Sequence, residues 1–424
     1  MNIIEILQDQ KQELAAIDTT KFCSREEEKQ FDLSSTLAQV VIGVRRSGKS
    51  TMCLKVLKDS GVRFGYVNFD DEQLAALKAT ELNDVLDAVY KVYGDVTHIF
   101  FDEIQNIPQW PLFINRLLRQ GVHLVLTGSN ANLLSGELAT HLTGRYNQIE
   151  LYPFSFSEYC RVRDVDILTD STKANALRYH ALSDYMQQGG FPELLRMQNP
   201  RTYTLSLLNA VIIKDICKRY NVKYQRTLAD MANGILDKFC QEISFSQLRE
   251  QYALGSLHTA KQYLYYLQEA YLVRLVPLYT FKNKDKQQAR KCYAVDTAFV
   301  TNHEDTLQTP NLGWRLENVI AIELLRRMNT EIENLFYYRK PKDFEVDFVR
   351  VKMSHIEELI QVTYDFREPS AKQYNREVGG LIKGAKLLHC SNLTLIMMDG
   401  TPRTIESDGY QIHCVRATDW LLQR

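Results

Sequence analysis

The sequence predicts an α/β fold in which a parallel sheet flanked by helices is followed by helical and mixed α/β regions. From about residue 40 to 150, the apolar runs VVIGV, FGYVNFD, HIFFD and HLVLTG alternate with longer helical stretches. Such runs are typical of central strands in a parallel sheet, because these strands are buried on both faces. Two further observations complete the prediction: the strand pattern stops after residue 153, and a helix-turn-helix-strand succession begins near residue 228.

Length and composition indicate several globular domains. The chain has 424 residues, and a domain size of roughly 150 residues gives about three cores. Hydrophobic residues make up 45% and charged residues 24%, which excludes a mainly disordered chain. Lys and Arg total 51 against 52 Asp and Glu, so any basic surface for nucleic acid must be local.

Cysteine and hydropathy patterns favour a cytoplasmic protein. The eight cysteines and nine histidines form no C-x-x-C or H-E-x-x-H pattern, so we expect reduced, mostly buried thiols and no zinc site. No apolar run reaches the roughly 18 residues of a membrane span. The start, MNIIEILQDQKQEL, lacks the apolar centre of a signal peptide, and we expect no membrane partner.

The strongest motif is GVRRSGKS, a phosphate loop between an apolar run and the start of a helix. Its glycines let backbone N–H groups curl around a phosphate, and its lysine supplies a mobile charge across the β- and γ-phosphates. A glycine-rich turn without a ligand would give no reason for Lys followed by Ser. We expect ATP binding, with Ser50 as a Mg²⁺ ligand, by Gly43, Val44, Arg45, Arg46, Ser47, Gly48, Lys49, Ser50 and Thr51.

A second motif, HIFFDE, is an apolar strand that ends in two carboxylates. We expect Asp102 to hold the Mg²⁺ shell and Glu103 to orient and deprotonate water. Strands often end in Asp because the chain turns there, but this pair follows a phosphate loop and precedes another strand. The adjacent Glu favours hydrolysis of ATP over phosphate transfer to a substrate.

Two further residues are candidates for the catalytic step. Asn130, after the strand HLVLTG, is placed to contact the attacking water or the γ-phosphate, and a helix cap is the alternative. Arg145 is a candidate for a charge-stabilising finger that acts on a neighbouring subunit's nucleotide, and a surface ion pair is its alternative.

The rest of the chain predicts three regions. Between residues 153 and 225, apolar residues three and four apart predict a helical subdomain with a joint at QGGFPEL. Helices around SFSQLREQY and HTAKQYLYYLQEAY, followed by the strand VRLVPLY, suggest a winged helix, with KNKDKQQARK as its wing tip or a solvated loop. Beyond residue 311, helices and strands predict a mixed sheet.

These motifs resemble those of a bacterial and archaeal AAA+ ATPase family, and the resemblance covers nearly the whole chain. The matching stretches are GVRRSGKS, FDEIQNIPQW, LTGSN, LTGRYNQIELYPFSFSEY and QGGFPEL. The resemblance implies an ATPase followed by a winged helix and a domain similar to restriction-endonuclease-like nucleases. We expect an N-terminal helical segment at 1–30, an AAA+ P-loop core at 31–160, a helical lid at 161–227, a winged-helix-like domain at 228–290 and the nuclease-like domain at 291–424.

The nuclease superfamily uses a helix Glu, a strand Asp and [EQ]-x-Lys to bind Mg²⁺ and activate water. Glu317, Asp347 and Gln361 occupy the corresponding places, but Thr363 stands where Lys is expected. A hydroxyl cannot supply the charge that stabilises the transition state, so we expect a domain retained for binding or scaffolding. The plainer interpretation places Glu317 and Asp347 as polar groups at a sheet edge.

Three functions remain open at this point. The first is a Mg²⁺-dependent ATPase coupled to DNA, to which Lys214, Lys218, Arg219, Lys223 and Arg226 would contribute if they share a face. The second is a slow switch in which ATP or ADP occupancy sets the oligomeric state or a protein contact. The third, an ATP-dependent nuclease, is weakened by Thr363.

Overall fold

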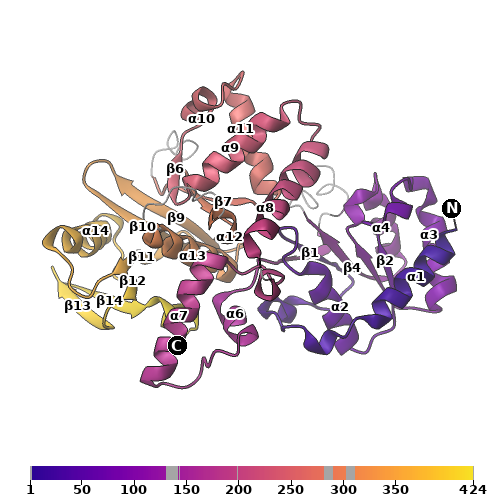
Figure 1. The fold of residues 1–424 in the computed structure, drawn as a ribbon, viewed down its shortest axis with the longest axis horizontal. Helices are drawn as coiled ribbons and strands as arrows, with labels where there is room; N and C mark the ends of the chain where they lie inside the picture. Colours follow the sequence, from indigo (N-terminus) through magenta and orange to yellow (C-terminus); the bar gives the residue numbers. More distant parts are fainter. Residues whose placement is uncertain are drawn as a thin grey trace. The chain divides into compact units, whose positions relative to one another are not determined.

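The computed structural model describes residues 2–129, 142, 144–197, 199–280, 290–301 and 311–423 (Figure 1). The chain divides into two compact units. The first comprises Met1–Pro153 with Glu269–Tyr271, and the second comprises Phe154–Gln268 with Leu272–Arg424.

A five-stranded parallel sheet forms the centre of the first unit, which confirms the predicted α/β class. Its order is β2-β3-β4-β1-β5, with the strands β1 (Ala38–Ile42), β2 (Phe64–Asn68), β3 (His98–Asp102), β4 (His123–Gly128) and β5 (Tyr146–Glu150). The edge strand β5 was not predicted, because in its sequence YNQIE only Ile149 is buried. This segment is a strand because its backbone pairs with β1 at the edge of the sheet, and its side chains show no hydrophobic pattern.

Helices cover both faces of this sheet. They are α1 (Ile3–Ala16), α2 (Lys49–Asp59), α3 (Leu82–Tyr93) and α4 (Trp110–Arg119). Consecutive residues of β3 face opposite layers: Phe100 packs in one core cluster with Met52 and Leu57 of α2, whereas the ring of Phe101 lies 5.8 Å from Phe113 of α4. Two-sided burial explains why β3 reads as a continuous apolar run.

The second unit begins with helices, as predicted for the region after the sheet. These are α6 (Phe156–Val162), α7 (Thr172–Gln188), α8 (Pro200–Ala210) and the π-helix η8 (Val211–Lys218). There follow α9 (Gln225–Asp237), β6 (Gln241–Ile243), α10 (Phe245–Gln251), α11 (Leu257–Glu269), β7 (Val273–Pro277) and β8 (Arg290–Ala294). The three strands form an antiparallel sheet in the order β6-β8-β7, so β8 spans the expected domain boundary at residue 290.

The predicted joint at QGGFPEL is a close approach of backbone to a buried carboxylate. Gly189 has a φ of 80°, and a Cβ there would overlap Oδ1 of Asp296. Asp296 accepts hydrogen bonds of 2.8 Å from the backbone N–H groups of Gly190 and Ala298. The two glycines therefore allow this turn to dock onto the residues that follow β8.

A six-stranded mixed sheet occupies the C-terminal region, as predicted (Figure 1). Its order is β13-β14-β12-β11-β10-β9, from β9 (Glu333–Lys340), β10 (Phe344–Lys352), β11 (His355–Asp365), β12 (Leu393–Asp399), β13 (Arg403–Ser407) and β14 (Tyr410–Arg416). The helices of this region are α12 (Ala298–Thr301), α13 (Leu312–Arg327), α14 (Ala371–Leu388) and α15 (Ala417–Leu421). Val378, Leu381 and Ala385 of α14 share one core cluster with residues of β10, β11 and β12.

Within the described residues, no helix has the length and apolarity needed to cross a membrane.

Candidate functional site

The phosphate loop connects β1 to α2 and has a backbone that only particular residues tolerate. Gly43 and Gly48 have φ values of 152° and 98°, and Arg46 also lies in the left-handed region at 69°. A Cβ on Gly43 would lie 2.1 Å from the carbonyl oxygen of Leu151, so a side chain is excluded there. Since α2 begins directly after Gly48, its unpaired N–H groups face the loop, which is the arrangement that binds phosphate.

Lys49 is buried inside this loop and its ammonium group is held by oxygen atoms. Nζ donates to the carbonyl oxygens of Gly43 and Val44, both at 3.2 Å. It also lies 4.0 Å from Oε1 of Glu103. The structure thus brings together the lysine and the carboxylate that the sequence assigned to the phosphates and to the water.

Asp102 is the centre of a hydrogen-bonded cluster at the end of β3. Its Oδ1 accepts from Ser50 Oγ at 2.8 Å and from Thr127 Oγ1, and its Oδ2 accepts from the Tyr66 hydroxyl at 3.3 Å. Burial, followed by the charge of Glu103, raises the pKa of Asp102 to about 6. A hydroxyl beside a carboxylate is a donor set that suits Mg²⁺, so Ser50 and Asp102 fit the predicted metal role.

Glu103 follows Asp102 with a φ of 53°, a left-handed conformation that is uncommon for Glu. Its backbone N–H donates to Thr127 Oγ1 at 3.0 Å, and its Oε2 accepts from the side chain of Gln105. Thr127 therefore contacts both acidic residues from the adjacent strand β4. Thr127 was not predicted as a site residue, although a polar residue within the apolar strand HLVLTG is a signal for it.

Arg25 is a second residue that the sequence analysis missed. It is 5% exposed, and its guanidinium donates to the carbonyl oxygens of Ser47 at 3.0 Å and Tyr152 at 2.7 Å. It thereby fastens the phosphate loop to the segment after β5. A lone arginine far from the motif in sequence carries no pattern that marks this contact.

The remaining predicted residues make contacts outside this cluster or lie apart from it, and the backbone oxygen of Arg145 accepts from Ala38 at the start of β1, the end opposite to the phosphate loop. Arg45 forms a 3.4 Å ion pair with Asp70, and Arg46 and Thr51 are exposed. Arg145 is exposed and donates to the side chain of Asn115 within the same unit. Asn130 lies outside the described residues.

The residues matched to the nuclease motif also come together, in a cavity of about 620 Å³ in the C-terminal region. Glu317, Asp347, Gln361 and Thr363 line it, and Glu345 and Glu377 contribute two more carboxylates. The interpretation of Glu317 and Asp347 as polar groups at a sheet edge is wrong. Strand β10 lies between β9 and β11, and Asp347 is only 6% exposed because α13 and α14 cover this part of the sheet.

A buried lysine on β8 points into the same carboxylate group. Nζ of Lys291 lies 3.0 Å from Glu317, 2.5 Å from Glu345 and 3.5 Å from Asp347. The positive charge that Thr363 cannot supply is therefore present, from a strand of another sheet. Burial and then the charge of Glu317 raise the pKa of Asp347 well above its usual range. In the described part of the chain, no three His, Cys, Asp or Glu side chains are arranged to hold a metal ion.

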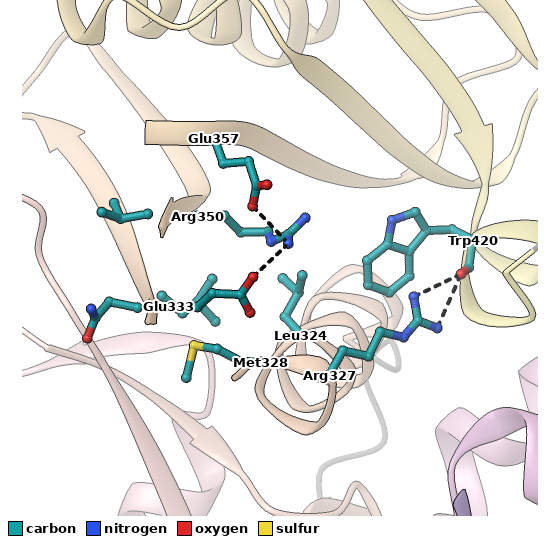
Figure 2. A pocket seen from close by; sticks show the side chains of 10 residues that line it. Leu324, Arg327, Met328, Glu333, Arg350, Glu357 and Trp420 are labelled. Carbon is teal, nitrogen blue, oxygen red and sulfur yellow. Dashed lines mark hydrogen bonds and ion pairs between the residues drawn. The ribbon is translucent and has the colours of Figure 1, made fainter. Parts of the chain in front are cut away.

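A smaller cavity of about 120 Å³ lies between α13, β10 and the C-terminal helix (Figure 2). Its charged groups already have partners: Arg350 pairs with Glu357 at 3.1 Å and Glu333 at 3.9 Å. Arg327 donates to the backbone oxygen of Trp420 and lies 4.5 Å from its ring. These contacts explain how the C-terminal helix is held in place.

Comparisons with known proteins place these observations in a family. A model described as an AAA domain matches residues 35–160, and a domain of unknown function matches residues 179–309. The uncharacterized protein MJ1544 of Methanocaldococcus jannaschii is 32% identical over 368 residues, which cover 84% of this chain and 80% of that protein. An uncharacterized protein of Haemophilus influenzae is 29% identical over 402 residues, covering 91% and 94%.

Among solved structures, the Walker-type ATPase PABY2304 of Pyrococcus abyssi is similar with a TM-score of 0.43 and 14% identity. The match covers 67% of this chain and 96% of that one. A likeness at this level carries no argument about function.

Proposed function

This chain belongs to the same family as MJ1544 of Methanocaldococcus jannaschii and carries an AAA domain, and we propose that it hydrolyses ATP with Mg²⁺ and couples its nucleotide state to DNA binding. One observation carries the ATPase part of the proposal. Ser50, Asp102 and Glu103 converge beside the buried ammonium group of Lys49, so the residues for the metal, the water and the phosphates share one site.

In the proposed reaction, the Lys49 ammonium exchanges its bonds with the Gly43 and Val44 carbonyls for bonds with phosphate oxygens. Ser50 and Asp102 would hold Mg²⁺, which neutralises charge on the β- and γ-phosphate oxygens. Glu103 accepts a proton from the attacking water, and Thr127 holds its backbone in position. Water oxygen forms the new P–O bond as the bond from the γ-phosphorus to the β,γ-bridging oxygen breaks, giving ADP and phosphate.

The DNA part rests on the order of elements from α9 to β8. Helix, strand, two helices and a two-stranded antiparallel pair support a winged helix, in which α11 would be the helix that meets DNA. Its exposed side chains include His258, Lys261, Gln262 and Tyr265. Hydrogen-bonding and cationic groups of this kind suit base edges and phosphates.

Steady-state phosphate release tests this proposal, with wild type, Lys49→Ala and Glu103→Gln, with and without duplex DNA at low and moderate salt. We expect wild type to turn over, Glu103→Gln to bind ATP but stall, and Lys49→Ala to lose both binding and turnover. DNA should raise the wild-type rate in a salt-sensitive manner. Binding of ATP without turnover or response to DNA would favour the slow switch instead.

Cleavage of a phosphodiester bond is a second candidate, because Lys291 supports it. The buried ammonium lies among the carboxylates where the nuclease motif would need a positive charge. Within the described residues, these carboxylates are not grouped as the ligands of a metal ion, and the Lys291 ammonium lies among them.

Nicking of supercoiled plasmid in Mg²⁺ or Mn²⁺ tests this candidate. If it is correct, wild type nicks the plasmid, and Lys291→Met lowers the rate by at least about 100-fold. Lys386→Met, which removes an exposed lysine of α14 paired with Asp408, should leave the rate unchanged. A thermal melt of each variant separates loss of chemistry from loss of folding, and absence of nicking by wild type would leave the cavity with a scaffolding role.

A further inference from the structure

We propose that the segment from Lys218 to Arg226 and the exposed face of α11 form one surface that binds single-stranded nucleic acid. This inference rests on the proposed function, because it names the form of nucleic acid to which the ATPase would be coupled. We call it the tyrosine-lysine surface. It consists of Lys218, Arg219, Lys223, Tyr224, Arg226, Lys261 and Tyr265, all of which are exposed.

The charge of this surface is one-sided. Residues 216–229 read ICKRYNVKYQRTLA, with four basic residues between the buried Asp215 and the exposed Asp230, in a chain whose net charge is −1. Within the described residues, Lys218, Arg219, Lys223 and Arg226 form no ion pair. Four cations without acidic partners make this a local basic surface, which the composition of the whole chain conceals.

Ring stacking fastens the two parts of the surface together. Tyr220 stacks on Tyr266 of α11 with ring centroids 3.9 Å apart and planes 12° apart. Tyr220 therefore holds the basic segment against α11.

Two tyrosine rings of the tyrosine-lysine surface are partly exposed to solvent. Tyr224 is 60% exposed and Tyr265 is 42% exposed, and among the described residues Tyr90 is the one other exposed aromatic side chain. Nζ of Lys223 lies 5.4 Å from the centre of the Tyr224 ring, so a cation accompanies the exposed ring. Exposed rings beside unpaired cations are the combination by which proteins stack bases and neutralise the phosphates between them.

The exposed rings decide between single and double strands. In a duplex, the faces of the bases already stack on each other, and only their edges and the phosphates remain accessible. In a single strand, each base has a free face, and stacking on an aromatic ring contributes about 1–3 kcal/mol per base. Tyr224 and Tyr265 would contribute little to duplex binding, so the surface is suited to unpaired nucleotides.

Fluorescence anisotropy of the full-length chain tests this inference with labelled oligo(dT), oligo(rU) and a duplex of the same length. The test variant is Lys223→Gln/Tyr224→Ala. The control is Tyr90→Ala/Lys91→Gln, which removes the same two neighbouring residue types from α3, where Tyr90 is also exposed. We expect tighter binding of the single strands than of the duplex, and about tenfold weaker single-strand binding for the test variant only.

Two further readouts make the test specific. Tyr224→Phe keeps the ring and should bind like wild type, whereas a role for the hydroxyl alone would weaken it as much as Tyr224→Ala does. Loss of the Lys223 contact should reduce the slope of log Kd against log salt by about 0.7. Comparison of oligo(dT) with oligo(rU) then shows whether the sugar matters.

Equal affinity for duplex and single strand, or equal effects of the two double variants, would overturn the inference. Phosphate release from the same preparations distinguishes it from the proposed function. ATP turnover that duplex DNA stimulates, without any binding of single strands, would leave the proposed function standing and overturn only this surface. Binding of single strands without any ATP turnover would overturn the proposed function and leave this surface standing.

Discussion

Ser50 Oγ donates a 2.8 Å hydrogen bond to Oδ1 of Asp102, although 52 residues separate them in sequence. One residue lies in the first turn of α2 and the other at the end of β3. The bond places the hydroxyl and the carboxylate proposed for Mg²⁺ next to each other before any ion binds. Thr127 and Tyr66 also donate hydrogen bonds to Asp102 and hold its carboxylate in place.

Thr127→Val should lower ATP turnover while leaving the protein folded. The substitution keeps the shape of the side chain but removes the hydroxyl that donates to Asp102 and accepts from the N–H of Glu103. Leaving that buried N–H without a partner costs about 1–3 kcal/mol of stability. We expect a fall in kcat of about 10- to 100-fold, measured by phosphate release. Thr127→Ser retains both bonds and should keep turnover near wild type; equal loss in both variants would contradict the role of the hydroxyl.

Mg²⁺-dependent nucleotide binding should strengthen as pH rises through about 6. Burial raises the pKa of Asp102 from 3.8 to about 6, so this carboxyl is protonated below that pH and binds a cation only when ionised. The same shift lowers the free energy of unfolding as the pH rises from 3.8 to 6. In that range Asp102 is protonated in the folded state and ionised in the unfolded state, so a rise in pH favours unfolding. Titration of a fluorescent ATP analogue from pH 5 to 8 checks the prediction, and Asp102→Asn should remove the dependence on pH.

Arg25→Ala should weaken ATP binding more than it slows turnover. Arg25 contacts the backbone of the phosphate loop at Ser47 and touches neither carboxylate of the site. Its loss leaves two buried carbonyls without their charged donor, at a cost of about 1.5–3 kcal/mol. We expect a several-fold rise in KM and a lower melting temperature. Arg119→Ala removes an exposed arginine of the same unit and serves as the control; a change in kcat alone for Arg25→Ala would contradict a positioning role.

Gly189→Ala should destabilise the second unit by about 2 kcal/mol or more. The new Cβ would overlap Oδ1 of Asp296, and the φ of 80° is unfavourable for alanine. Gly313→Ala is the matched control, since no atom lies within 4 Å of a Cβ built there, in a helix where alanine is preferred. Thermal denaturation should show a lower midpoint for the first variant and an equal or higher one for the second.

Local sequence predicted the elements of the molecule well where burial sets the pattern. The continuous apolar run of β3 corresponds to burial on both faces of the sheet. The apolar residues three and four apart in α7 correspond to burial on one face of the helix. Strand β5 escaped prediction because its hydrogen bonds to β1, and not its side chains, define it. Asn130 and residues 282–289 of the predicted wing tip KNKDKQQARK lie outside the described part of the chain. The prediction of a loop was wrong for the last two residues of that segment, because Arg290 and the buried Lys291 pair within the sheet as part of β8.

The sequence by itself determined the phosphate loop, because the backbone of GVRRSGKS and its lysine form a contiguous unit whose chemistry depends on spacing alone. Only the tertiary structure decided which distant residues support it. Thr127 and Arg25 act through hydrogen bonds that require β4 and the N-terminal segment to be packed in place. The same holds for Lys291, whose charge reaches Glu317 and Asp347 from another sheet. Charge and hydrogen bonding act across space, so a motif read along the chain places Thr363 where a cation is expected and does not reveal the lysine that supplies it.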